Sequence, residues 1–265
     1  MIAAVAFAAT AGGLVAGLLG VGGGIVLVPA LDLALGAAGV DREVSLHIAV
    51  ATSMATIIPT AISSTRAHAS RNAVDFAVVK RWAVPIVIGA LAGSLAAAHV
   101  NGKVLAAVFG VVALLSALKM LLPLDGVVLR SSLPGGVGGA LLPAFIGGIS
   151  AMMGIGGGTL SVPTKTLCGE PVHKAVGTAA LLGLWIALPA TVGYLVAQVP
   201  DGAVVPPLTI GYVSLIGLAL VAPITWLVAP FGARLAHSMD RRKLSAAFGA
   251  FLMIVAVRML YRALS

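Results

Sequence analysis

The stretch GLLGVGGGIVLVP, from Gly17 to Pro29, decides the fold of this chain, because four of its glycines fall within five positions (Gly20 and Gly22 to Gly24). Glycine is about 1 kcal/mol less favourable than alanine in a helix, so three in a row predict a break. A second copy, GIGGGTLSVP from Gly154 to Pro163, repeats the glycine run and the proline five residues beyond it. The duplication indicates that the break belongs to the architecture.

The composition is that of an integral membrane protein. The chain is 60% hydrophobic and only 9% charged, whereas soluble domains carry roughly 25% charged residues. Most of its apolar stretches fit the ~20 residues of a spanning helix; they are Ile2–Val40, Val44–Thr65, Val74–His99, Val104–Leu122, Val137–Leu167, Val172–Val199, Gly211–Ala236 and Leu244–Leu264. The N-terminus lacks the positive region of a cleavable signal peptide, so we expect it to be the first retained limb. We predict an all-α, polytopic membrane protein.

Several other classes of protein are disfavoured. The net charge of +8 is expected from Lys and Arg in cytoplasmic loops, so it does not indicate nucleic-acid binding. The single cysteine, Cys168, cannot form an internal disulfide, and its most economical role is that of a small buried apolar residue. No Cys/His pattern has zinc spacing, and no Walker motif or nucleophile elbow is present. We therefore expect no enzyme activity, no metal and no cofactor.

The chain reads as an internal duplication. HIAVATS at His47 aligns with HKAVGTA at His173, 126 residues later. Three further matches share an offset of 139 and pair Gly93, Phe109-Gly110 and Lys119-Met120 with Gly232, Phe248-Gly249 and Arg258-Met259. We predict a first repeat at residues 1–124, a linker at 125–135 and a second repeat at 136–265, together forming one membrane domain.

The distribution of cations favours inverted repeats. If each glycine-broken segment were one span, the repeats would be parallel and the 16 Lys and Arg would divide evenly. If each is a re-entrant-like hairpin followed by three spans, the repeats are inverted. Only Arg42, Lys103, Arg258 and Arg262 then share one side, and the other cations lie opposite. This asymmetry is what the positive-inside rule predicts, and it places the loop Pro200–Pro207 outside.

Inversion gives the glycine runs a function. Two hairpins that enter from opposite faces would bring Gly22, Gly23 and Gly24 close to Gly156, Gly157 and Gly158 near the membrane midplane. Glycine tolerates the backbone angles of such turns, and the N-terminal ends of broken helices carry partial positive charge. We therefore predict an anion-binding site at the two tips. The alternative is that these glycines only allow close packing of helices.

The paired motifs GLLGVGGGIVLVP and GGISAMMGIGGGTLSVP, each followed by a helix with AVATS or AVGTA, resemble the TauE/SafE family of sulfite and organosulfonate exporters over the whole chain. The resemblance implies a multi-pass carrier of the inner (plasma) membrane that moves a small sulfur-containing anion such as sulfite or sulfoacetate. That family is usually described with seven or eight spans, a count in which a hairpin can pass as one span.

Hydroxyl side chains are the first candidates to complete the anion site. Thr52 and Ser53 in the first half and Thr178 in the second follow the paired histidines. A hydroxyl donates a hydrogen bond to an anion without a fixed charge that would trap it. The alternative is that each hydroxyl bonds to its own helix carbonyl. For Ser63, Ser64 and Thr65, helix capping or solvation is the simpler explanation.

The paired histidines, His47 and His173, begin their helices at matched positions. A protonated imidazole would attract an anion or carry a coupling proton; the alternative is a histidine at the membrane surface that bonds water or a helix end. Trp185, seven residues after Thr178, is expected on the same helix face and is a candidate for gating or coupling, although tryptophans are also common membrane anchors.

Two ionisable residues are candidates for gating or coupling. Lys165 follows Pro163 closely and is either an anion gate or a lysine whose ammonium reaches the interface. Asp32 is the only carboxylate inside an apolar limb. It is a possible proton-coupling group, or a carboxylate near the outer interface.

Two functions remain. The leading one is a secondary transporter that works by alternating access around the two tips, in the lipid bilayer and with protons as a possible coupling ion. The alternative is a membrane scaffold or channel subunit. The sequence indicates no oligomeric state.

Overall fold

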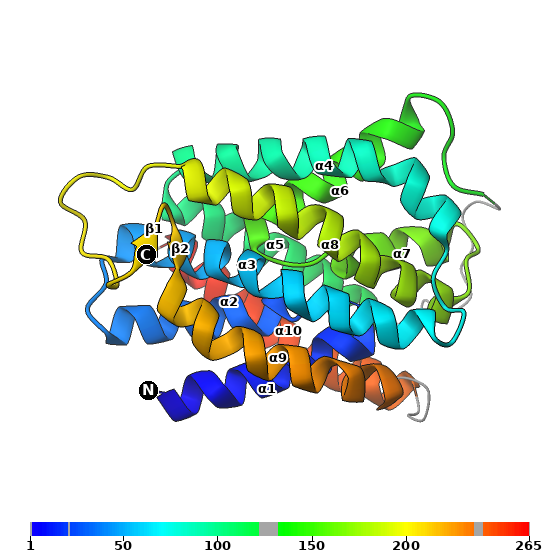
Figure 1. Cartoon of the computed structure of the whole chain (residues 1–265), viewed down its shortest axis with the longest axis horizontal. Coiled ribbons are helices and arrows are strands. Elements are labelled where there is room, and N and C mark those ends of the chain that lie inside the picture. The colour runs from blue at the N-terminus through cyan, green and yellow to red at the C-terminus, as the bar shows by residue number, and fades with distance from the viewer. Residues whose placement is uncertain (1, 21, 122–131, 236–240, 265) are drawn as a thin grey trace.

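The computed structural model describes residues 2–20, 22–121, 132–235 and 241–264. Its elements are α1 (Ile2–Leu19), α2 (Gly24–Ala37), α3 (Arg42–Ala69), α4 (Phe76–His99), α5 (Gly102–Leu121), α6 (Gly138–Met153), α7 (Gly158–Leu167), α8 (Val172–Val196), β1 (Thr209–Ile210), β2 (Val213–Ser214), α9 (Leu215–Leu235) and α10 (Arg241–Leu264). The two short strands form an antiparallel pair just before α9 (Figure 1). The predicted all-α class is confirmed.

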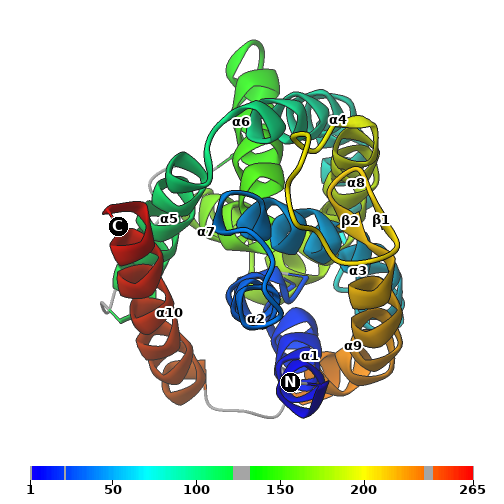
Figure 2. The same cartoon turned by 90° about the vertical axis from the view of Figure 1, so that its left-hand side faces the viewer.

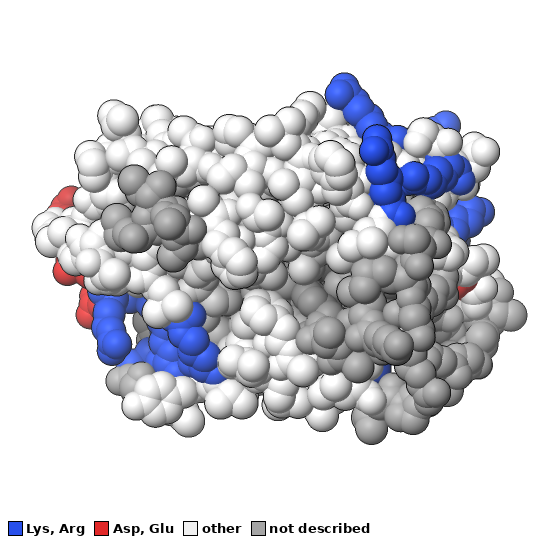
Figure 3. Space-filling view, turned by 90° about the horizontal axis from the view of Figure 1, so that it is seen from below, with Lys and Arg blue, Asp and Glu red and all other residues white. Residues whose placement is uncertain are grey.

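The long helices have the dimensions of membrane spans. Among the described residues, α3, α4, α5, α8 and α9 are each long and apolar enough to cross a bilayer. On the face shown in Figure 3, charged side chains gather toward the two ends of the molecule and leave an uncharged region between them. Together with the five long apolar helices, this pattern confirms a polytopic membrane protein, because the uncharged middle of the helices is the part that a bilayer would cover.

The glycine runs divide two apolar stretches into hairpins. The N-terminus and the end of α2 lie at the same end of the molecule, whereas α6 begins and α7 ends at the opposite end (Figure 1). The turns need glycine because Gly22 and Gly23 have φ values of 74° and 77°, and Gly154 has 66°. The two hairpins therefore enter the bundle from opposite ends.

Corresponding helices of the two halves run in opposite directions. In Figure 1, α3 runs from left to right and α8 from right to left, and the same reversal relates α9 to α4. The hairpins also cross over, since α1 packs on α9 and α6 packs on α4. The pairs α3–α8 and α5–α10 join the halves as well, with α5 and α10 side by side at one edge (Figure 2). This arrangement is the one an inverted repeat requires, while the repeat boundaries stay a prediction.

Small residues allow the crossed helices to touch. A side chain on Gly93 would collide with the carbonyl oxygen of Gly148, and one on Gly232 would collide with the carbonyl oxygen of Leu14. In the alignment of the two halves these are equivalent contacts, since Gly93 pairs with Gly232 and Leu14 lies 134 residues before Gly148. The same backbone-to-backbone packing therefore fixes both hairpins.

Candidate functional site

The two glycine tips meet inside the bundle. A Cβ atom built on Gly22 would lie 3.2 Å from the Cα atom of Gly156. Each tip also rests on the third helix of the other half: Gly20 lies against the carbonyl oxygen of Val176 in α8, and Gly154 lies against that of Val50 in α3. The structure thus brings together the two glycine runs that the sequence predicted to meet.

Two helices begin at this contact. The helix α2 starts at Gly24, with Gly23 as its left-handed N-cap, and α7 starts at Gly158 after Gly157. The first N–H groups of a helix have no partner within it, and they give that end a partial positive charge. Two such ends next to each other form an environment that favours a small anion.

The six tip glycines are not equivalent. A side chain on Gly23 would strike the carbonyl group of Gly12, and one on Gly24 would strike the carbonyl oxygen of Gly154. Packing alone therefore requires glycine at 23 and 24. A Cβ on Gly157 would instead meet the end of the flexible Ile186 side chain at 3.1 Å, so this position tolerates a small side chain and can be tested.

Of the predicted hydroxyls, Ser53 is the one that lies at the tips. Its Oγ donates a hydrogen bond of 2.8 Å to the carbonyl oxygen of Gly154, and it is also 2.9 Å from a Cβ built on Gly24. Further along α3, Thr56 donates to the carbonyl oxygen of Ser53 and Thr60 to that of Thr56. Buried hydroxyls therefore follow α3 away from the tips.

Thr52 and Thr178 hold loops of the opposite half. The Thr52 hydroxyl accepts a hydrogen bond of 3.0 Å from the backbone N–H of Ser214, and Thr178 accepts one of 2.9 Å from that of Asp75. Ser214 and Asp75 directly precede α9 and α4, and they are equivalent in the alignment of the halves. We infer that this exchanged pair positions α4 and α9.

The two histidines lie at opposite ends of the bundle. His47 is buried, with Nδ1 3.0 Å from the carbonyl oxygen of Glu43 and Nε2 3.0 Å from that of Val100. His173 is exposed at the start of α8. The structure therefore does not bring the two rings to the tips together, although their positions in the two repeats match.

Lys165 does not extend its ammonium group to the surface. The side chain has 0% exposure, and Nζ donates a hydrogen bond of 2.7 Å to the carbonyl oxygen of Ala175 in the first turn of α8. The acidic groups that attract it are Glu170 and Asp75. The cation therefore joins the end of the second hairpin to α8.

Asp32 belongs to a buried ionic cluster at the other end of the bundle. It is 3% exposed, it forms an ion pair with Arg262, and its Oδ2 is 3.6 Å from Nη2 of Arg258. Ser45 donates a hydrogen bond of 3.0 Å to Oδ1. The sequence does not pair either arginine with Asp32. The cation distribution does place Arg258 and Arg262 on the side of the membrane with few cations, which agrees with an Asp32 near the outer interface.

Charged groups outside the spans gather where α4 and α8 begin. Lys174 approaches Asp75 Oδ2 at 2.7 Å, and its hydrogen bond lowers the pKa of the Asp75 carboxyl below the ordinary value. Burial raises the pKa of Glu170, and its Oε2 has no hydrogen-bond partner in the described part of the chain.

Trp185 is 40% exposed on the outside of α8, whereas Thr178 is fully buried, so the two side chains do not share a helix face as the sequence predicted.

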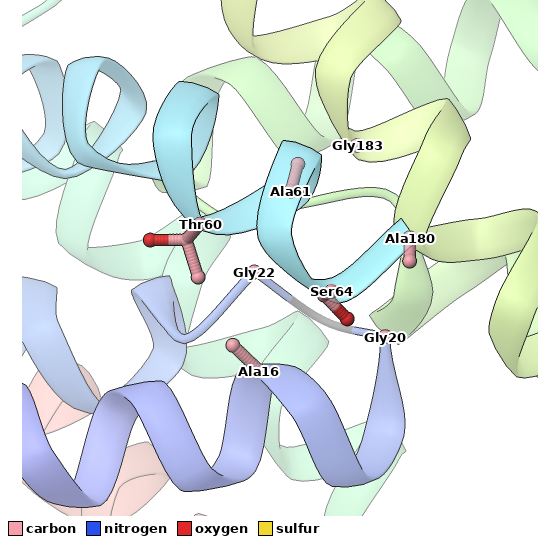
Figure 4. Close-up of a pocket in the computed structure, with 8 residues that line it drawn as sticks. All are labelled: Ala16, Gly20, Gly22, Thr60, Ala61, Ser64, Ala180 and Gly183. Atoms are coloured by element: carbon pink, nitrogen blue, oxygen red, sulfur yellow. The ribbon is translucent and has the colours of Figure 1, made fainter. Parts of the chain in front are cut away.

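A narrow hollow lies beside the tips, between α1, α3 and α8 (Figure 4). Gly20, Gly22 and Gly183 contribute backbone to its wall, while Thr60 and Ser64 contribute side chains. The space between these residues is about 190 Å³, a volume that includes the part open to the outside, and it has no room for an enclosed water molecule. No group of three metal-binding side chains occurs in the described residues, so nothing there suggests a metal centre.

Comparison with known proteins shows the family. The family model described as Sulfite exporter TauE/SafE matches residues 5–259. The chain is 28% identical to a "Probable membrane transporter protein" of Haemophilus influenzae, over 93% of each chain. It is 26% identical to the "Probable membrane transporter protein YunE" of Bacillus subtilis, over 94% of this chain and 93% of the relative. No solved structure matches it.

Proposed function

We propose that this chain, a membrane transporter that belongs to the sulfite exporter TauE/SafE family, exports a small sulfur-containing anion such as sulfite or an organosulfonate across the inner membrane. It acts as a secondary carrier, by alternating access around the contact of the two glycine tips. The family supports the substrate class, and the site geometry supports the mechanism.

One observation carries the proposal: two hairpins from oppositely directed halves place Gly22 against Gly156. A packing motif needs glycines only where helices touch, and Gly23 and Gly24 satisfy that need. It does not explain why two broken helices direct their N-terminal ends to one place inside the membrane. Irregular backbone at that depth is costly unless it lines a cavity or a site.

The chemistry of the contact suits a carrier. The donors available to an anion are the first-turn N–H groups of α2 and α7; the Ser53 hydroxyl beside them donates to the carbonyl oxygen of Gly154. Together they offer partial charge in a region of low dielectric, where it acts strongly. A full cation at the same place would bind more tightly and would slow release. Lys165 contacts the carbonyl oxygen of Ala175 instead, and we propose it as the gating or proton-coupling residue.

The proposed sidedness follows the charges. The C-terminal end of α3 and the N-terminal ends of α4 and α8 carry Arg66, Arg71, Lys80, Arg81 and Lys174. Under the positive-inside rule this end faces the cytoplasm. The hollow beside the tips is lined by the C-terminal half of α3 and the N-terminal half of α8, the halves nearer to the end from which an exporter takes its substrate.

Flux in proteoliposomes tests this function. We expect saturable movement of radiolabelled sulfite or sulfoacetate, with each anion inhibiting the other, and a rate that changes with an imposed pH gradient if protons are coupled. A scaffold would give no flux above that of empty vesicles, and a channel would give flux that does not saturate. Either result would overturn the proposal.

A further inference from the structure

The hydroxyl of Ser64 is buried and unpaired among the described residues. It lies 2% exposed in α3, and its Oγ has no hydrogen-bond partner in the described part of the chain. A serine within a helix usually bonds back to a carbonyl one turn earlier, as Thr60 does with Thr56. Burying a hydroxyl without a partner costs free energy, so an unsatisfied one in a native protein needs an explanation.

The neighbouring hydroxyls of Ser63 and Thr60, in contrast, both have hydrogen-bond partners. The Ser63 hydroxyl donates a hydrogen bond of 2.8 Å to the carbonyl oxygen of Trp226. The Thr60 hydroxyl is paired with that of Thr225 at 2.7 Å, so only its methyl group faces the hollow. Among the side chains that line the hollow, Ser64 alone offers an unused donor, and Figure 4 shows this hydroxyl directed toward the chain at Gly20.

The two halves differ at the positions that line the hollow. In the alignment of HIAVATS with HKAVGTA, Ser64 corresponds to Ala190, Thr60 to Ile186, and Gly183 to Ile57. Both isoleucines are fully buried, and they press on the tips, Ile57 at 3.1 Å from a Cβ built on Gly22 and Ile186 at 3.1 Å from one built on Gly157. The hollow is thus lined by Thr60, Ser64 and Gly183, where the matched positions of the other half hold two isoleucines and an alanine.

We propose that Ser64 is a substrate ligand: when the hollow widens, its Oγ–H donates a hydrogen bond to an oxygen of the anion held against Gly20 and Gly22. This inference rests on the proposed transport function and adds the residue and the side on which the substrate is first bound. The walls beside the hydroxyl are alanine methyl groups of α1, α3 and α8. These walls fit a compact sulfur oxyanion that carries either no substituent or only a short substituent.

Equilibrium binding tests the assignment. The full chain in lipid nanodiscs is titrated with radiolabelled sulfite and, separately, with sulfoacetate. Ser64→Ala should weaken binding and raise both dissociation constants by roughly ten-fold, as expected for the loss of one hydrogen bond to a charged ligand. Thermal stability should stay unchanged or rise, because the variant removes an unsatisfied buried hydroxyl. A residue with a merely structural role would lower the stability instead.

Two matched variants complete the experiment. Ser63→Ala removes a neighbouring hydroxyl that is already bonded away from the hollow, so its dissociation constants should equal those of the wild type. Gly183→Ala adds a methyl group with ordinary contacts, 3.7 Å from the nearest atom, and it should weaken sulfoacetate more than sulfite because the hollow narrows.

The outcomes separate the two proposals. If the wild type binds either anion and Ser64→Ala binds it equally well, the assignment of Ser64 is wrong and the transport function stands. If Ser63→Ala weakens binding as much as Ser64→Ala, the effect is a general one of α3, and the assignment also fails. If the wild type binds neither anion, the proposed substrate class fails first.

Discussion

The hydroxyl of Thr178 in α8 accepts a hydrogen bond of 2.9 Å from the backbone N–H of Asp75, the residue that precedes α4 in the other half. Thr52 in α3 makes the equivalent bond to Ser214 before α9. Each half thus fixes the start of a helix of the other. The relationship links the duplicated sequence to a mechanical unit, because α4 cannot shift at this end without disturbing α8.

Thr178→Val should therefore lower stability. The valine matches the shape of threonine but leaves the N–H of Asp75 without its partner, which costs about 1–3 kcal/mol. Thermal unfolding in detergent should show a melting temperature several degrees lower. Thr191→Val is the control, since that hydroxyl lies in the same helix and has no partner in the described residues. Equal losses in the two variants would contradict the role of Thr178.

Asp75 should also give a pH-dependent contribution. Its folded pKa is lowered, chiefly by the hydrogen bond from Lys174, so its stabilising effect is complete above its ordinary pKa of about 3.9. The effect is lost as the pH falls through the lowered value, because the carboxyl then becomes protonated. The melting-temperature difference between wild type and Asp75→Asn should thus be present near pH 7 and shrink below about pH 4. A difference that grows in acid would refute this assignment.

The Asp32 cluster predicts a structural carboxylate. Removing one partner of a fully buried ion pair costs roughly 3–5 kcal/mol. We expect less from Asp32→Asn, because the side chains of Arg258 and Arg262 are 33% and 22% exposed. The melting temperature should fall, while the pH dependence of sulfite flux should match that of the wild type. Loss of that pH dependence, with stability retained, would instead make Asp32 the coupling group.

The sequence predicted the arrangement of the backbone better than the roles of side chains. Glycine runs, helix lengths and cation positions are local or additive signals, so they indicated hairpins that enter from opposite ends and tips that meet. Hydrogen-bond partners distant in the chain leave no such signal. Thr52 and Thr178 were placed on the right helices, yet their partners are backbone groups 162 and 103 residues away.

The role of Ser64 likewise could not be predicted from the sequence alone. Its position near a helix end suggested capping or solvation. In the structure the residue is buried, with 2% of its surface exposed, and it lines the hollow. The sequence held one usable clue, the alignment of Ser64 with Ala190. An unmatched polar residue within a duplicated apolar pattern marks a difference between the halves, although only the structure shows that the hydroxyl has no partner.

The membrane topology can be measured directly. Arg66 lies over the Trp226 ring at 5.9 Å, so the end of α3 and the second half of α9 are at one end of the bundle. In a Cys168→Ser background, cysteines placed in the range 66–71 and in 241–243 should react with an impermeant reagent only after the cytoplasmic side is exposed. A cysteine in 200–207 should react from outside. Labelling of 66–71 and 241–243 from opposite sides would exclude inverted repeats.

The tip glycines give the most direct separation of packing from substrate binding. Gly24→Ala places a methyl group against the carbonyl oxygen of Gly154. Because backbone cannot yield as a flexible side chain does, this variant should be poorly stable and should fail through folding. The methyl group of Gly157→Ala comes close only to the end of the Ile186 side chain, at 3.1 Å, and makes ordinary contacts with Leu182 and Gly183. The φ of −58° at this position is open to any residue. This variant should therefore fold with a near-normal melting temperature, yet transport sulfite with a raised KM, because the added methyl group lies at the N-terminal end of α7, where we propose that the anion binds. Purified protein yield and melting temperature, measured beside flux, keep the two effects apart. A Gly157→Ala protein with unchanged KM would assign the tips to packing and move the search for the site to other parts of α3 and α8.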